Sequence, residues 1–225
     1  MKISKLAVVA IASVVAVFIR AIYFTPIEAK QGAAQKILYV HAPSAWVAFL
    51  AFGLVAVASG LYLWLRDPKL DYIAESSAEV GLVFTTAVLL TGPLWAKPVW
   101  GAYWTWDARL TFTLVLWFVY VGYLVLRGAI EDRDMRARYS AVLGILGAAL
   151  VPFIHLSVYM FRTLHPMPVL MKPSAPSMPP VMTVTLVSSF AAFTLLYVWL
   201  LRERYKLAVA RDAADHRLYG TEGAV

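Results

Sequence analysis

The segment Glu79–Arg127, EVGLVFTTAVLLTGPLWAKPVWGAYWTWDARLTFTLVLWFVYVGYLVLR, decides how this chain folds. Two apolar blocks, at 79–94 and 110–127, flank the aromatic stretch Trp95–Asp107. Similar blocks recur along the chain, and about 17–25 apolar residues are needed to cross a bilayer as a helix. Of the 225 residues, 61% are hydrophobic and 15% are charged, whereas a soluble domain is roughly half apolar and a quarter charged. The sequence therefore predicts an all-α integral membrane protein.

We expect a single domain, a bundle of six transmembrane helices at residues 6–24, 44–65, 79–94, 110–127, 139–161 and 181–201. The first block is longer than the apolar part of a signal peptide, about 7–15 residues, which favours an uncleaved span. The TGP sequence at 91–93 is expected to end or kink the third span. Six of the twelve prolines lie within 166–180, which predicts a stiff or extended connection. Residues 202–225 are expected to form a polar tail.

Residues 25–43 are expected to connect the first two spans. Ala33, Ile37 and Val40 have helical spacing, so part of this connection is predicted to be a short helix on the membrane surface. Pro43 suits the first turn of the second span. His41 is therefore expected just before that helix begins, at the boundary between membrane and water.

Lysine and arginine are unevenly divided between the two ends of the predicted bundle. Of the twenty, thirteen fall on the side of the chain termini, and Arg20 lies inside a span. The other side has six, which are Lys30, Lys36, Lys97, Arg109, Arg162 and Lys172. Because cytoplasmic connections are rich in these residues, both termini are predicted to be cytoplasmic. The same bias accounts for the net charge of +7, so no nucleic-acid partner is expected.

Residues 95–109 are predicted to form a tryptophan-rich loop on the outer face. Four of the eight tryptophans lie in it, and an exposed aromatic loop is costly unless it covers something apolar. An interfacial aromatic belt is the alternative, but a belt would spread tryptophan over both interfaces. We therefore favour a platform for a flat, apolar ligand. If the stretch is partly helical, Trp106 points elsewhere, and one face gathers Trp100, Tyr103, Trp104 and Asp107.

His41 and His165 lie on the same predicted face, on either side of the aromatic loop in sequence. Alone, each is more often a hydrogen-bonded interfacial residue than a ligand. Two neutral imidazoles beside an aromatic platform can instead hold a haem iron axially. A bare divalent metal would need three or four ligands, and Asp107 is the only acidic residue near in sequence. The chain has no cysteine, which excludes a thioether bond to haem within it.

The remaining polar candidates leave two interpretations open. His155 falls inside the fifth span, where its depth makes it a functional candidate or a residue bonded to a neighbouring helix. The basic residues of the outer loops are either ordinary loop charges or partners for the two haem propionates, and they are Lys97, Arg109, Arg162 and Lys172.

The sequence WGAYWTWDARLT closely resembles the tryptophan-rich signature WGxxWxWDxR of the WWD-domain proteins, which handle haem in cytochrome c biogenesis. Three groups share this signature: the CcmC family, the CcmF haem lyase subunit and the CcsA-type synthase subunit. Six spans in 225 residues, with one outer histidine on each side of the signature, resemble the CcmC family. The segments ILYVHAPSAW and RTLHPMPV also resemble its histidine regions, although Met160 and Phe161 replace two expected tryptophans.

The resemblance implies that haem b is bound at the outer, periplasmic face of the cytoplasmic (inner) membrane. His41 and His165 would be the axial ligands of its iron. The residues that would contact the rest of the haem are Trp95, Trp100, Tyr103, Trp104, Trp106, Asp107 and Arg109. The implied role is to deliver haem to the haem chaperone CcmE.

The resemblance further implies a complex with the ABC-transporter subunits CcmA and CcmB and the small membrane protein CcmD. The chain has no GxxxxGK[ST] phosphate-binding loop, so ATP hydrolysis is expected in CcmA. We therefore expect a haem-presenting protein more than an ordinary enzyme. The first alternative is a haem lyase or synthase that attaches haem to apocytochrome c, and the second is a small-solute transporter.

Overall fold

The computed structural model describes residues 4–167, 170 and 177–219. Within these residues the chain is helical apart from short connections, and it has no β-strand. Six helical stretches are long and apolar enough to cross a membrane: Lys5–Tyr23, Ala33–Leu65, Pro68–Trp100, Ala108–Ala129, Arg133–Met160 and Pro180–Asp215. The predicted all-α fold with six membrane-crossing helices is confirmed.

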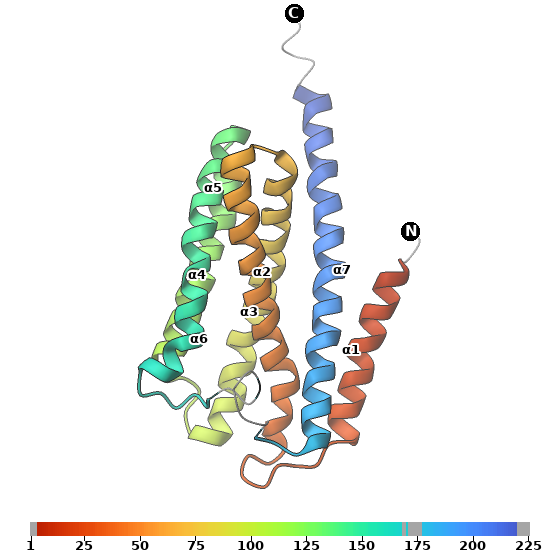
Figure 1. Cartoon of the computed structure of the whole chain (residues 1–225), viewed down its shortest axis with the longest axis vertical. Coiled ribbons are helices and arrows are strands. Elements are labelled where there is room, and N and C mark those ends of the chain that lie inside the picture. The colour runs from red at the N-terminus through yellow and green to blue at the C-terminus, as the bar shows by residue number, and fades with distance from the viewer. Residues whose placement is uncertain (1–3, 168–169, 171–176, 220–225) are drawn as a thin grey trace, which may run out of the picture.

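The helices form one bundle in which α7 lies beside α2 and α3, and α1 packs on α7 (Figure 1). The elements are α1 (Lys5–Tyr23), the 3₁₀-helix η1 (Ala33–Ile37), α2 (Leu38–Leu65), α3 (Pro68–Trp100), α4 (Ala108–Ala129), α5 (Arg133–Ala148), α6 (Leu150–Met160) and α7 (Pro180–Tyr219). Helices α5 and α6 together make one crossing of the bundle (Figure 1).

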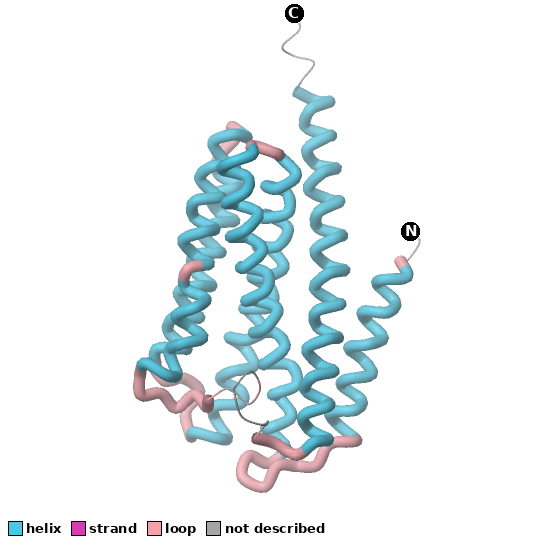
Figure 2. The backbone as a smooth tube through the Cα atoms, in the orientation of Figure 1, coloured by secondary structure: helices cyan, strands magenta, loops and turns pink. Residues whose placement is uncertain are grey.

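Successive crossings run in opposite directions, so three connections meet at one end of the bundle (Figure 2). We call this the loop end, and it holds residues 24–37, 101–107 and 161–167. The opposite end holds the connections at 66–67 and 130–132, and we call it the charged end.

Helix α3 is longer than predicted at both ends. It begins at Pro68 because Asp67 caps it, accepting a hydrogen bond from the backbone N–H of Lys69 at 2.9 Å. It continues through Pro93 and stops at Gly101, which takes the left-handed conformation with φ 79°. The TGP sequence, which was expected to end or kink this helix, does not end it, since membrane helices tolerate proline where neighbours satisfy the freed backbone. Only residues 101–107 of the expected loop are non-helical.

The short helix before α2 was predicted, but its boundary with α2 was not. Residues Ala33–Ile37 form the 3₁₀-helix η1, and α2 follows without a gap from Leu38. Pro43 therefore lies inside α2 rather than in its first turn. As a result, His41 is a residue of α2 and does not precede it.

Two further boundaries differ from the expectation. The fifth crossing is divided at Ala149, three residues before Pro152. Because proline has no backbone N–H, Pro152 leaves the carbonyl of Ala148 without its helical hydrogen-bond partner. Helix α7 extends to Tyr219, well into the stretch expected to be a tail. Its polar part is anchored, because Arg204 of α7 forms a two-bond ion pair with Glu79 of α3.

The centre of the bundle is packed closely enough to fix the positions of the helix ends. Phe52 of α2 stacks on Tyr120 of α4 with ring centroids 3.8 Å apart. A Cβ atom at Gly144 of α5 would lie 2.8 Å from Val55 Cγ1, so only glycine allows this approach of α5 to α2. The loop end therefore rests on a rigid scaffold.

Candidate functional site

The loop end brings together side chains from α2, α3, α4 and the segment after α6. The rings of His41 and Trp95 meet edge to face at 5.8 Å, and those of Trp100 and His165 at 6.4 Å. Arg109 Nη1 lies 3.1 Å from His165 Nδ1, and His41 is within electrostatic range of both residues. Residues far apart in sequence thus form one cluster containing two imidazoles.

His41 has a defined tautomer. Its Nδ1 lies 3.0 Å from Thr91 Oγ1 on α3, and the Thr91 hydroxyl also lies 2.6 Å from the carbonyl oxygen of Ala87. A carbonyl only accepts, so the single hydroxyl proton of Thr91 is donated to Ala87. Thr91 must therefore accept from His41 Nδ1–H, which leaves the lone pair of His41 on Nε2. This is the atom that a metal would bind.

Gly92 leaves room for the His41 ring. A Cβ atom at this position would lie 3.3 Å from His41 Cε1, closer than side chains normally approach. Thr91 and Gly92 were missed as functional residues. The signal was present in the TGP sequence, which was expected only to end or kink the third span.

His165 is held by a relay that begins at Asp107. One carboxylate oxygen of Asp107 caps α4 by accepting from Leu110 N–H at 3.0 Å, and the other accepts from the Thr163 hydroxyl at 2.9 Å. Thr163 Oγ1 in turn accepts the backbone N–H of His165 at 3.1 Å. Asp107 thus acts as a positioning residue that ties the segment after α6 to the start of α4.

His165 is neutral at physiological pH. Burial and, to a smaller extent, the nearby Arg109 guanidinium together lower the pKa of His165 to about 4, against smaller opposing effects of the Pro166 carbonyl and Asp107. A neutral imidazole is the form that can bind a metal.

The predicted aromatic residues take three kinds of position. Trp95 and Trp100 line the histidine cluster, and Trp95 Nε1 donates to Gln31 Oε1 at 2.9 Å. Trp104 is half-buried, whereas Tyr103 and Trp106 are 58% and 76% exposed. The common face expected for residues 100–107 assumed a helix, but the chain is non-helical from 101 to 107.

The loop end has unsatisfied polar groups of the kind that a ligand would complete. Trp104 Nε1 and Thr105 Oγ1 are buried and have no hydrogen-bond partner among the residues that the structure describes. Beside them, a hollow of about 260 Å³ is lined by Thr105, Asp107, Arg162, Thr163 and Leu164. Two imidazoles, aromatic rings and spare donors fit a large, flat ligand with an iron centre and polar edges.

The other predicted candidates contribute less to this cluster. Lys97 Nζ lies over the Tyr103 ring at 5.3 Å and donates to Gly101 O at 3.0 Å. Arg162 lines the hollow, His155 is half-buried on α6, and Lys172 lies outside the described residues, as do 168–169 and 171–176 of the proline-rich stretch.

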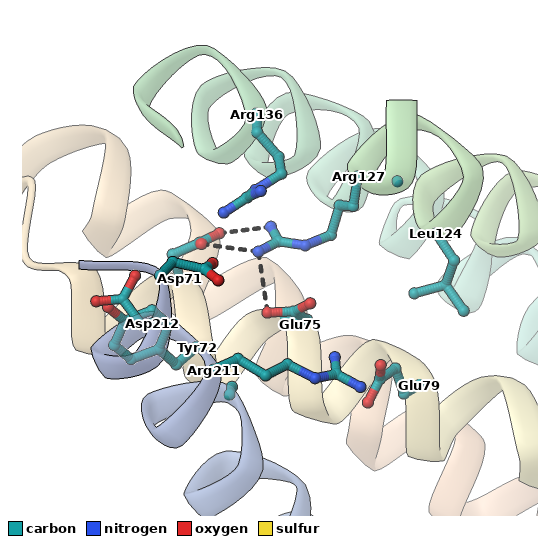
Figure 3. A pocket seen from close by; sticks show the side chains of 12 residues that line it. Asp71, Tyr72, Glu75, Glu79, Leu124, Arg127, Arg136, Arg211 and Asp212 are labelled. Carbon is teal, nitrogen blue, oxygen red and sulfur yellow. Dashed lines mark hydrogen bonds and ion pairs between the residues drawn. The ribbon is translucent and has the colours of Figure 1, made fainter. Parts of the chain in front are cut away.

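The charged end has its own hollow, of about 330 Å³, which was not predicted (Figure 3). Arg127 of α4 reaches across it to α3 and bonds Asp71 at 2.7 and 2.9 Å and Glu75 at 3.1 Å. Arg127 is 7% exposed. Since acids and bases here are paired across helices, this network ties the bundle together and is separate from the histidine cluster.

Comparison with known proteins agrees with this geometry. The family model for CcmC, heme exporter protein C, matches residues 1–219. Proteins named heme exporter protein C are 40% identical over 176 residues in Bradyrhizobium diazoefficiens, 36% over 191 in Haemophilus influenzae and 39% over 159 in Escherichia coli K12.

These matches cover 78%, 85% and 69% of this chain, and 66%, 78% and 65% of those proteins. The chain therefore spans slightly less than two thirds of the length of two of these relatives. The match of the family model over nearly the whole sequence and the identities above 30% show that the chain belongs to the CcmC family, heme exporter protein C.

Proposed function

We propose that this chain binds haem b at the loop end and passes it on during the maturation of c-type cytochromes. The observation that carries the proposal is the pairing of two imidazoles in one aromatic cluster, with the lone pair of His41 directed onto Nε2 by Thr91. The names of the relatives support the same ligand.

In this proposal His41 and His165 are the axial ligands of the iron. Trp95 and Trp100 already lie against the two imidazoles, so a macrocycle between the histidines would contact both indoles. Burial of the porphyrin would supply most of the affinity, at about 25 cal/mol per Å² of apolar surface. Arg109 is the cation best placed to meet a propionate.

The loop end is proposed to face the periplasm, with both termini in the cytoplasm and the bundle in the inner membrane. Its support is the excess of lysine and arginine at the charged end. A chain without cysteine allows a direct test by labelling. Lys30→Cys at the loop end should react with an impermeant maleimide in cells with a permeabilised outer membrane, whereas Arg138→Cys should not. The opposite labelling pattern would reverse the orientation.

The proposed recipient of the haem is the chaperone CcmE, and the proposed partners are CcmA, CcmB and CcmD. Tyr103 and Trp106 are exposed on the connection 101–107 that follows Trp100, where a recipient could approach the loop end. Loss of the histidine ligands should abolish haem on CcmE while the complex with CcmA and CcmB still forms. Co-purification of the partners with each variant, followed by haem staining of CcmE, measures both.

The decisive experiment is the absorption spectrum of the protein purified from haem-replete cells. The wild type should show low-spin, six-coordinate haem, and His41→Ala and His165→Ala should each lose that signature. His155→Ala, on helix α6 that leads into the segment of His165, is the matched control and should keep it. A haem-free wild type, or an unchanged spectrum in both variants, would reject the proposal.

A further inference from the structure

His165 Nδ1 has two partners that cannot both be satisfied. Arg109 Nη1 lies 3.1 Å from it, and the carbonyl oxygen of Pro166 lies 3.2 Å from it. A guanidinium only donates hydrogen bonds and a carbonyl only accepts them. In a neutral imidazole Nδ1 is either the acceptor or the donor, so only one of the two bonds can exist at a time.

The choice of partner decides whether His165 can bind iron through Nε2. When Arg109 donates to Nδ1, the proton of the neutral ring is on Nε2, and Nε2 has no free lone pair. When Nδ1–H donates to Pro166 O, the lone pair is on Nε2. His41 has no such choice, because Thr91 accepts from its Nδ1–H.

Arg109 lacks an anionic partner within the part of the chain that the structure describes. The nearest carboxylate, that of Asp107, is engaged by Leu110 N–H and the Thr163 hydroxyl, and Arg109 forms no ion pair. A half-buried guanidinium bound only to a neutral imidazole will move to a carboxylate that comes within reach, because the carboxylate adds the attraction of an opposite charge and can accept two parallel hydrogen bonds.

We propose that Arg109 is a switch that makes His165 a ligand only when a porphyrin carboxylate is present. The carboxylate draws Arg109 away from Nδ1, the ring exchanges tautomer, and Nδ1–H donates to Pro166 O. The ring gains one proton at Nδ1 and loses one from Nε2 to solvent, so its charge does not change. When the carboxylate leaves, Arg109 returns and His165 releases the iron. This inference rests on the proposed function.

The switch is tested by removing the porphyrin carboxylates. Haem-depleted, full-length protein in detergent is reconstituted with iron mesoporphyrin or with its dimethyl ester, and the coordination state is read from the absorption spectrum. The wild type should become six-coordinate with the diacid and remain five-coordinate, bound through His41, with the ester. The Arg109→Ala protein should become six-coordinate with the ester, because in this variant His165 Nδ1–H is free to donate to Pro166 O. Lys97→Ala, the matched control for loss of a cation, should behave as the wild type.

The tautomer of His165 can also be measured directly, in protein without any porphyrin. In haem-free protein with ¹⁵N-labelled histidine, His165 should have its proton on Nε2 in the wild type and on Nδ1 in Arg109→Ala. Six-coordinate ester complexes in the wild type, or the same tautomer in both proteins, would overturn the switch while leaving the proposed function standing. Failure of the diacid to reach six-coordination in the wild type would instead reject the proposed function.

Discussion

His41 Nδ1 on α2 lies 3.0 Å from Thr91 Oγ1 on α3, and this bond determines which nitrogen of His41 is free. Thr91→Val should remove the acceptor and weaken haem binding about 10–100-fold, the usual effect of losing a group that orients a metal ligand. Thr91→Ser keeps the hydroxyl and should bind as the wild type does. Haem titration followed by absorbance measures both, and equal affinity of the Val and Ser variants would contradict this role.

Gly92 is predicted to be needed for the position of the His41 ring. Gly92→Ala places a Cβ atom 3.3 Å from His41 Cε1, so the ring must move. An off-rotamer side chain costs about 0.5–1.5 kcal/mol, which corresponds to a loss of up to about tenfold in haem affinity. Gly53→Ala on α2 is the control, because nothing lies within 4 Å of its Cβ. Haem titration should separate the two variants, and matching affinities would refute the prediction.

Haem binding is predicted to resist mild acid. Since the pKa of His165 is lowered to about 4 from 6.5, the ligand stays neutral from pH 7 to about pH 5, and affinity is lost as the pH falls through about 4. Arg109→Gln removes a nearby positive charge, so the pKa of His165 should rise and the loss should begin at higher pH. Affinity measured between pH 4 and 8 checks the prediction. If the wild-type affinity for haem instead fell with a midpoint near pH 6.5, the pKa of His165 would not be lowered by its surroundings.

Asp107 is predicted to act through His165 rather than on the ligand itself. Asp107→Ala should cost about 0.5–2 kcal/mol of stability as a lost helix cap. It should also release Thr163 and with it His165, so that haem becomes five-coordinate. Asp132→Ala loses the equivalent cap of α5 at the charged end, where Asp132 accepts from Met135 N–H at 2.7 Å. The Asp132→Ala protein should be destabilised to a similar extent, but its haem spectrum should be unchanged. A six-coordinate haem in the Asp107→Ala protein would exclude the relay from Asp107 to His165.

The general plan of the site could be predicted because it depends on the number of crossings. With an even number of crossings between them, His41, the aromatic stretch and His165 must lie at one end of the bundle. The residues that orient the histidines could not be found in this way. Thr91 is fifty residues from His41 in sequence, and only the packing of α3 against α2 brings them together.

The helix boundaries were predicted least well, and for a physical reason. Hydropathy marks where apolar residues begin and end, but these helices extend beyond that point on polar contacts. Arg204, in the part of α7 that was expected to be a tail, forms an ion pair with Glu79. Asp71, in the part of α3 that was expected to be a loop, forms an ion pair with Arg127. Such pairs join residues that are 125 and 56 positions apart, so local sequence does not reveal them.

The Arg127–Asp71 pair is predicted to stabilise the bundle without affecting the haem site. Both side chains are buried, so Arg127→Ala leaves the acids without a counter-charge and should cost about 3–5 kcal/mol. Arg138→Ala removes an exposed pair with Asp134 on α5 and should cost at most about 1 kcal/mol. Thermal unfolding in detergent compares the two, and the haem spectrum of folded Arg127→Ala should remain six-coordinate. A similar midpoint for both variants would mean that the buried network contributes no more than a surface pair.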